Sequence, residues 1–465
     1  MAQIEYLIVG LKFAGYLPET NLELSLMKRP VDVLRYLFLA TVMCVPSLVL
    51  AETAPYVTTI DKISAGDTAW MLSSTALVLL MTIPGLALFY AGMVRKKNVL
   101  STALQSFAIC ALVTVVWVVI GYSLAFTAGS TPYLGGFSRL FLEGMTFDKV
   151  QGLTSVSHVA PTIPESVLVM FQMTFAIITP ALITGAFAER MRFSALVVFM
   201  VLWSIFVYAP VAHWVWEPSG WLATMGALDF AGGTVVHINA GAAGLVCAYM
   251  LGKRQGYGRE PFFPNNLAFT LIGASLLWVG WFGFNAGSAL SADGRAGLAM
   301  LVTQVAAATG ALGWMFLEWL RRGKASLLGA CSGAVAGLVA ITPASGFVEV
   351  KAALIIGLLA GITCYWGATG LKRILGADDS LDVFGIHGIG GIVGALLTGV
   401  FAQKHLSGVD ASLSIQAIGA FSTLIYSAAA SWIILSVIDW TIGLRVEAEH
   451  EVIGLDLTQH GEQIP

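Results

Sequence analysis

The sequence predicts an all-α polytopic membrane protein with eleven transmembrane helices. Apolar residues make up 57% of its 465 residues and charged residues only 11%, against about 25% charged residues in an average soluble protein. Apolar runs of membrane-spanning length recur along the chain. A pattern of Asp, His and Gly also returns in the second half, which predicts an inverted repeat of five plus five helices and one additional C-terminal helix.

The first 51 residues are typical of a targeting segment. A basic start at 28–35 precedes an apolar stretch at 36–50 and the small residue Ala51, which is the layout of a signal peptide cleaved after Ala51. Met27 is then the expected start of translation, and residues 1–26 are an upstream extension. The alternative is an uncleaved helix, but the apolar stretch is shorter than the roughly 20 residues of a span.

Eleven later runs are long enough to cross about 30 Å of hydrocarbon. Their approximate limits are 68–93, 99–126, 164–187, 193–211, 234–251, 266–285, 297–320, 327–342, 351–371, 387–402 and 416–442. We therefore expect a membrane domain at 52–442, with one repeat at about 66–251, the second at about 266–402 and the eleventh helix at about 416–442. Residues 443–465 form a tail.

Lysine and arginine residues predict the orientation. The loops after odd-numbered spans and the segment after span 11 hold fourteen: Arg95, Lys96, Lys97, Arg190, Arg192, Lys253, Arg254, Arg259, Arg321, Arg322, Lys324, Lys372, Arg373 and Arg445. The opposite side holds six: Lys62, Arg139, Lys149, Arg295, Lys351 and Lys404. Because cytoplasmic loops are rich in these residues, we expect the mature N-terminus outside and the tail in the cytoplasm.

Two histidines define the internal repeat. His237 and His387 are 150 residues apart, and each has an Asp eight residues before it and Gly residues four and seven after it. Since they begin spans 5 and 10, the two copies enter the membrane from opposite faces. Substrate paths in such folds lie near the midplane, between the repeats.

Ionisable residues within spans are rare and usually face the interior of the bundle. We interpret His237 and His387 as a neutral imidazole pair in a pore, because two contacting imidazoles are not both protonated cheaply in a low dielectric. Two alternatives stay open. The histidines are separate packing residues, or they bind a haem, which a Soret band would reveal.

Asp229 precedes Gly232, Gly233 and a helix beginning near Thr234. A carboxylate there accepts backbone N–H groups at the helix start. We favour this structural role over direct contact with a cation, and expect the same of Asp379.

Aromatic residues gather near the predicted outer face. They are Phe171, Phe175, Trp214, Trp216, Trp221, Trp281, Phe282 and Phe284, with Ser288 four residues after the last. An aromatic face beside a hydroxyl binds a small cation through cation–π attraction and one hydrogen bond. An interfacial aromatic belt is the alternative. The five cysteines are not spaced for a disulfide or a metal site, and we expect no metal, cofactor, nucleic acid partner or enzymatic activity.

Several long motifs together resemble the ammonium transporters of the Amt/Mep/Rh family, most closely the bacterial ammonium channels. They include "ALITGAFAERMRFSA", "AHWVWEPSGWL", "LDFAGGTVVHINAGAAGL", "GWFGFNAGSAL" and "DVFGIHGIGGIVGALLTGVFA". The resemblance runs from about residue 66 to 463 and covers essentially every span.

The resemblance implies ammonium and ammonia transport, with methylammonium as an analogue, across the bacterial inner membrane by a homotrimer with one pore per protomer. It assigns Trp216, Ser288 and Phe175 to an outer ammonium site, with Asp229 nearby. Phe175 and Phe284 match two stacked rings that close the pore. His237 and His387 match the twin histidines below them, which makes them candidates for a proton relay.

The family also implies a cytoplasmic P-II-type signalling protein as a partner. An ammonium sensor that signals through its tail is the alternative function. A tail of only about 23 residues disfavours it.

Overall fold

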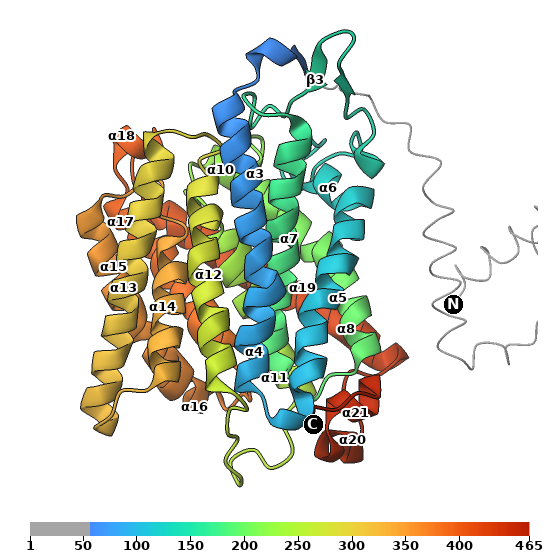
Figure 1. Cartoon of the computed structure of the whole chain (residues 1–465), viewed down its shortest axis with the longest axis vertical. Helices are drawn as coiled ribbons and strands as arrows, with labels where there is room; N and C mark the ends of the chain where they lie inside the picture. Colours follow the sequence, from blue (N-terminus) through green and yellow to red (C-terminus); the bar gives the residue numbers. More distant parts are fainter. Residues whose placement is uncertain (1–55, 465) are drawn as a thin grey trace, which may run out of the picture. The chain divides into compact units, whose positions relative to one another are not determined.

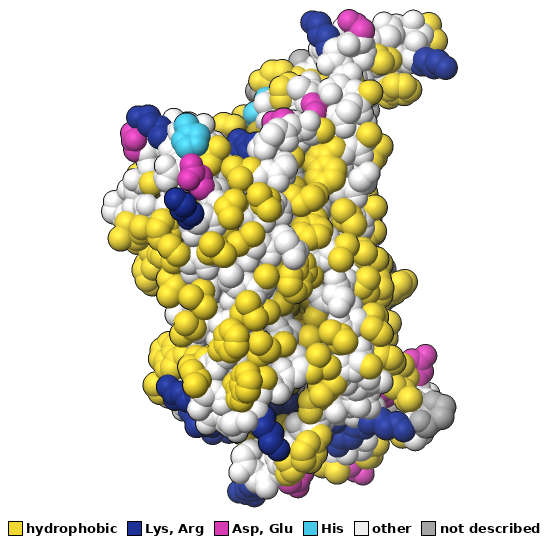
Figure 2. All heavy atoms as spheres, turned by 60° about the vertical axis from the view of Figure 1, so that its left-hand side comes forward, with side chains coloured by type: hydrophobic (Ala, Val, Ile, Leu, Met, Phe, Trp, Pro, Cys, Tyr) yellow, Lys and Arg dark blue, Asp and Glu magenta, His cyan; other side chains and the backbone are white. Residues whose placement is uncertain are grey.

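A computed structural model describes residues 56–464, so the predicted signal segment and its cleavage site lie outside the described residues. Within them, ten helical segments are long and apolar enough to cross a membrane. On the face drawn in Figure 2, hydrophobic side chains cover the middle, and most charged side chains gather toward the two ends. This distribution is that of a multi-pass membrane protein.

The predicted spans correspond to helical segments in the same order. Spans 1 to 4 are α3 (Ala65–Leu80), η4 (Met81–Leu86) and α4 (Ala87–Met93); η5 (Lys96–Asn98), α5 (Val99–Val116), η6 (Trp117–Gly121) and α6 (Tyr122–Phe126); α7 (Glu165–Phe187); and α8 (Phe193–Trp203), η8 (Ser204–Tyr208), α9 (Ala209–Trp216) and α10 (Trp221–Thr224). Spans 5 to 7 are η9 (Gly233–Ile238) and α11 (Asn239–Leu251); α12 (Leu267–Gly287); and α13 (Gly294–Arg322).

The remaining spans include one short helix. They are α14 (Leu327–Ile341); α15 (Val350–Trp366), η10 (Gly367–Leu371) and α16 (Lys372–Leu375); η11 (Phe384–Gly388) and α17 (Ile389–Phe401); and α19 (Leu413–Thr441). The short helix is α14, with 15 residues. The Ser326 side chain caps its start, and Pro343 follows soon after its end, where proline commonly ends a helix.

The two ends of the bundle carry different structures (Figure 1). One end, here the sheet face, has an antiparallel sheet in the order β1 (Val57–Thr59), β3 (Leu153–Ser155) and β2 (Phe147–Asp148). Short helical turns also lie outside the spans: η3 (Ile60–Lys62), η7 (Leu140–Leu142) and α18 (Lys404–Ser407). The other end, here the tail face, has α20 (Ala448–Ile453) and α21 (Leu455–His460).

The C-terminal tail packs against the ends of the spanning helices on this side of the bundle. The Asp456 carboxylate accepts the backbone N–H groups of Leu100 and Ser101 at 3.1 and 2.7 Å, near the start of α5. Arg445 donates to the Leu251 carbonyl oxygen at 2.8 Å and forms an ion pair with Glu451 at 2.7 Å. The tail therefore connects the start of α5 with the end of α11.

The helices that carry the two histidines run in opposite directions. α11 ends at Leu251, on the tail face, whereas α17 leads to α18, which lies toward the sheet-face end in Figure 1. α11 packs against η11, and α17 packs reciprocally against η9. This arrangement confirms the predicted inverted repeat.

Gly241 and Gly388 lie where these two helical segments cross, and they let the backbones come into contact. A Cβ atom on Gly241 would lie 2.5 Å from the Cα atom of Gly388, and backbone atoms cannot yield as a flexible side chain can. We expect Gly241→Ala to lower the unfolding free energy by about 3 kcal/mol, the upper range for overpacking. Thermal unfolding in detergent measures this change.

Gly297 in α13 is the matched control, because a Cβ atom there meets no atom within 4 Å. Gly297→Ala should leave stability unchanged or raise it slightly, since alanine favours helix. Equal unfolding midpoints for the two variants would contradict the proposed role of the crossing.

Candidate functional site

The structure brings His237 and His387 into contact in the middle of the bundle. Their Nδ1 atoms are 3.3 Å apart, and the rings are nearly parallel at 19° with centroids 5.3 Å apart. Both residues are buried. The interpretation as two unrelated packing histidines is therefore wrong in its geometry.

The contact constrains the protons of the pair. One Nδ1 must carry hydrogen and donate, while the other accepts. In the neutral pair, the donating ring has a bare Nε2 and the accepting ring has Nε2–H. The Nε2 atom of His237 is buried and has no hydrogen-bond partner among the described residues. The pair therefore offers one acceptor and one donor. These roles exchange when the bare Nε2 gains a proton, the Nδ1 proton crosses to the other ring, and that ring releases its Nε2 proton.

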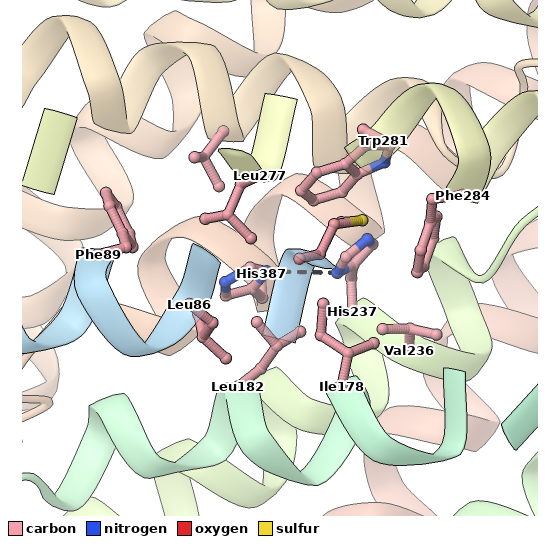
Figure 3. A pocket seen from close by; sticks show the side chains of 12 residues that line it. Leu86, Phe89, Ile178, Leu182, Val236, His237, Leu277, Trp281, Phe284 and His387 are labelled. Carbon is pink, nitrogen blue, oxygen red and sulfur yellow. Dashed lines mark hydrogen bonds between the residues drawn. The ribbon is translucent and has the colours of Figure 1, made fainter. Parts of the chain in front are cut away.

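A largely apolar cavity surrounds the pair (Figure 3). Its lining comprises Met81, Leu86, Phe89, Ile178, Leu182, Val236, His237, Leu277, Trp281, Phe284, Val335 and His387. Figure 3 shows the histidines between Phe284 at one end and Phe89 at the other. The Trp281 indole N–H is occupied by Thr342 Oγ1 at 2.9 Å. The two imidazoles are therefore the polar groups available to a small molecule there.

Three predicted aromatic residues form a continuous series toward the histidines. The Trp216 ring meets Phe175 edge-on at 5.8 Å, and Phe175 is stacked on Phe284 at 4.2 Å. Phe284 in turn lies 6.1 Å from the His237 ring. Phe175 and Phe284 are fully buried, and their stacked rings lie between Trp216 and the His237 ring.

Ser288 lies one turn beyond Phe284, at the C-terminal end of α12. Its hydroxyl donates to the Phe284 carbonyl oxygen at 2.8 Å, and its oxygen keeps acceptor capacity for a donor ligand. The side chain is half-buried. Ser288 therefore offers a hydrogen-bond acceptor on the sheet-face side of the ring stack.

Two predicted aromatic residues belong elsewhere. Trp214 packs against Trp221 at 5.7 Å and Tyr426 at 4.7 Å, and its indole N–H donates to the Tyr133 carbonyl oxygen. These contacts join α9 to α10 and α19. The aromatic cluster expected from the sequence thus divides into two groups.

Asp229 caps the helix that carries His237. Its carboxylate accepts the backbone N–H groups of Gly232, Gly233, Thr234 and Val235 at 2.6–3.0 Å. Burial raises the pKa of the Asp229 carboxyl to about 6, although these four bonds favour the anion. The predicted capping geometry is confirmed. The Asp229 carbonyl oxygen also accepts the Trp216 indole N–H at 2.9 Å, which fixes that ring.

Asp379 occupies the corresponding position before His387. Its carboxylate accepts the N–H groups of Val383 and Phe384 at 3.0 and 2.8 Å, two bonds where Asp229 has four. Of its two acidic neighbours, Asp382 pairs with Lys372 at 2.7 Å and Asp378 with Arg254 at 2.8 Å.

Sequence reasoning missed a buried charge cluster on the tail face. Arg254 bridges Asp378 and Glu189 at 2.8 and 3.1 Å, and Glu189 also binds Arg95 at 2.8 Å. Burial raises the pKa of Glu189, but the two guanidinium groups outweigh it and hold the pKa below its usual value. These pairs fix the loop before Asp379.

Sequence reasoning also did not predict the Trp281 ring stacked over His237 at 5.4 Å. The sequence indicates Trp281 only as one of several aromatic residues near the outer face. The available signal was its helical spacing, three residues before Phe284.

Together these features define a multi-pass membrane transport protein with an apolar, histidine-bearing cavity between two inverted repeats. The model of the Ammonium Transporter Family matches residues 69–464, and the chain belongs to this family. It is 50% identical over 407 residues to an ammonium transporter of Bacillus subtilis (strain 168), covering 86% of this chain and 98% of that relative.

Two solved structures have a fold similar to that of this chain. Mep2 of Candida albicans has a TM-score of 0.78 and 35% identity, covering 87% of this chain and 91% of that one. A protein described as a sensor Amt protein has a TM-score of 0.78 and 28% identity, covering 86% and 99%. Family membership supports ammonium transport, a non-enzymatic function.

Proposed function

We propose that ammonium is recruited beside Trp216, Phe175 and Ser288, loses its proton near the Phe175–Phe284 stack, and crosses as ammonia past His237 and His387. The continuous order of rings from Trp216 to the histidine pair is the observation that carries this proposal. The sheet face is then the outer face of a bacterial inner membrane, with the tail in the cytoplasm.

The outer site must distinguish ammonium from potassium, which has the same charge and similar size. Only ammonium donates directed hydrogen bonds. The Ser288 oxygen supplies an acceptor, and the faces of Trp216 and Phe175 supply cation–π attraction. Together they favour ammonium where bulk electrostatics does not.

Deprotonation follows from the cavity's chemistry. Placing a small ion in a medium of low dielectric has an idealised cost of about 20 kcal/mol. Ten of the twelve residues lining the cavity are aliphatic, aromatic or methionine, and the other two are the histidines. Neutral ammonia avoids most of this cost. The exchangeable donor and acceptor of the imidazole pair suit both ammonia passage and separate proton transfer, either directly or through internal water.

Assembly and regulation are proposed from the family likeness. We infer a homotrimer in membrane lipid, with the tail face available to a cytoplasmic P-II-type protein. A sensor function is the second candidate, favoured by the structural likeness to a sensor Amt protein. Robust uptake of labelled methylammonium would favour transport over sensing alone.

Labelled methylammonium uptake with ammonium or potassium as competitor tests the outer site. We expect Ser288→Ala and Trp216→Leu each to weaken apparent affinity by about tenfold, since each loses an interaction of about 1–2 kcal/mol with the cation. In both variants, the advantage of ammonium over potassium as a competitor of methylammonium uptake should also be smaller.

Trp214→Leu is the matched control, because Trp214 lies in the other aromatic group. Its affinity and selectivity should equal those of the wild type. Indifference of both Ser288→Ala and Trp216→Leu would contradict the outer-site assignment.

A further inference from the structure

A histidine–glutamate pair lies beside the helix end that carries Trp216. His158 Nε2 contacts both carboxylate oxygens of Glu217, at 3.1 and 2.9 Å. The His158 side chain is 29% exposed and that of Glu217 only 3%. Solvent thus reaches the imidazole, while the carboxylate is buried behind it.

Glu217 follows Trp216 directly and is the C-terminal cap residue of α9. Its backbone N–H donates to the His213 carbonyl oxygen, and its carboxylate accepts the Ser219 hydroxyl at 3.2 Å. These bonds hold the carboxylate of the residue that directly follows Trp216, at the end of the same helix.

The surrounding charges leave Glu217 with one ion-pair partner. Within residues 56–464, His158 is the only cationic side chain that forms an ion pair with it. Nearby Glu165 is already paired with Arg139 at 2.9 Å and accepts the Tyr122 hydroxyl.

Two neighbouring aromatic groups complete the surroundings. The Tyr56 ring packs against His158 at 5.8 Å. His213 is buried, with its Nδ1 at 3.2 Å from the Ala125 carbonyl oxygen.

Protonation of His158 changes the charge beside the site. Nε2 faces the carboxylate and keeps its hydrogen in both states, so the titrating proton is gained or lost at Nδ1. The hydrogen bond to Glu217 raises the pKa of His158, although burial opposes this. The charged pair is neutral overall, and loss of the Nδ1 proton leaves one net negative charge.

We propose that Glu217 is an additional recruitment residue for ammonium, and that protonation of His158 masks its charge. This inference rests on the proposed function of the neighbouring Trp216 site. Ammonium affinity then increases as pH rises, in a window above the ordinary histidine pKa of about 6.5. A single unmasked charge within about one Debye length of a cation site changes the affinity for the cation by about threefold at low salt.

The test measures the half-saturating ammonium concentration for current in proteoliposomes, at equal pH on both sides from about 5.5 to 8.0. The wild-type value should fall about threefold across this range. His158→Gln should remain at the wild-type high-pH value, because its net charge is always negative. The double variant His158→Gln/Glu217→Gln should remain at the wild-type low-pH value, because its net charge is zero.

His405→Gln is the matched control, since His405 is exposed and lies in α18, on the sheet face. It should keep the wild-type profile. A wild-type pH dependence in His158→Gln, or equal affinities of His158→Gln and the double variant, would overturn the proposal. Absence of both ammonium current and labelled methylammonium uptake in the wild type would instead contradict the proposed function. Size-exclusion profiles establish that each variant is folded.

Discussion

Replacing His237 or His387 with alanine is expected to reduce ammonium-evoked current in proteoliposomes by about a hundredfold, the lower range for removal of a positioned proton-transfer group. Each substitution removes one half of the Nδ1–Nδ1 contact. The remaining imidazole then has no second ring with which to share the Nδ1 proton. Recordings normalised to the amount of folded protein measure this effect.

The double variant sharpens this test. If the two rings act as one unit, His237→Ala/His387→Ala should be about as impaired as either single variant, because residues of a unit are not additive. His213→Gln is the control, since His213 is also a buried histidine but contacts Ala125 rather than the cavity. Unchanged current in both single variants would show that the histidine relay is wrong.

Asp229→Ala is expected to lower the unfolding free energy by about 4 kcal/mol. The substitution leaves four buried backbone N–H groups without their carboxylate. The start of η9 then loses its support, and the backbone whose carbonyl oxygen holds the Trp216 indole is less firmly fixed, so uptake should fall together with stability. Thermal unfolding and methylammonium uptake on the same preparations measure both effects.

Two further variants test whether the loss of stability follows the number of hydrogen bonds that the side chain accepts. Asp229→Asn keeps one side-chain oxygen and should be intermediate. Asp379→Ala should cost about half as much as Asp229→Ala, because its carboxylate accepts two N–H groups rather than four. Loss of uptake at an unchanged unfolding temperature in Asp229→Ala would instead favour direct contact between this carboxylate and the ion.

The fold was largely predictable because membrane burial requires long apolar segments, and these are visible as runs of residues. The pairing of His237 with His387 followed from equal spacing to Asp and Gly in two copies. The capping by Asp229 followed from short-range helix chemistry. Each of these inferences uses either local sequence or an exact internal comparison within the chain.

Other features depend on tertiary contacts that no spacing specifies. The separation of Trp214 from Trp216, two residues apart on α9, depends on which side of the helix each ring faces. Arg254 meets Glu189 and Asp378 across 65 and 124 residues of sequence. The Nδ1–Nδ1 orientation depends on side-chain rotamers. Such pairings are set by the three-dimensional packing of the helices.

The Gly241–Gly388 crossing bears on how substrate gains access to the cavity. The two repeats touch there through backbone, with no side chain between them to adjust. In transporters that work by alternating access, one repeat rocks against the other around the substrate. Such rocking would have to open this crossing first. Under the proposed function, we therefore expect side chains such as Phe175 and Phe284 to move during conduction while this backbone crossing stays closed.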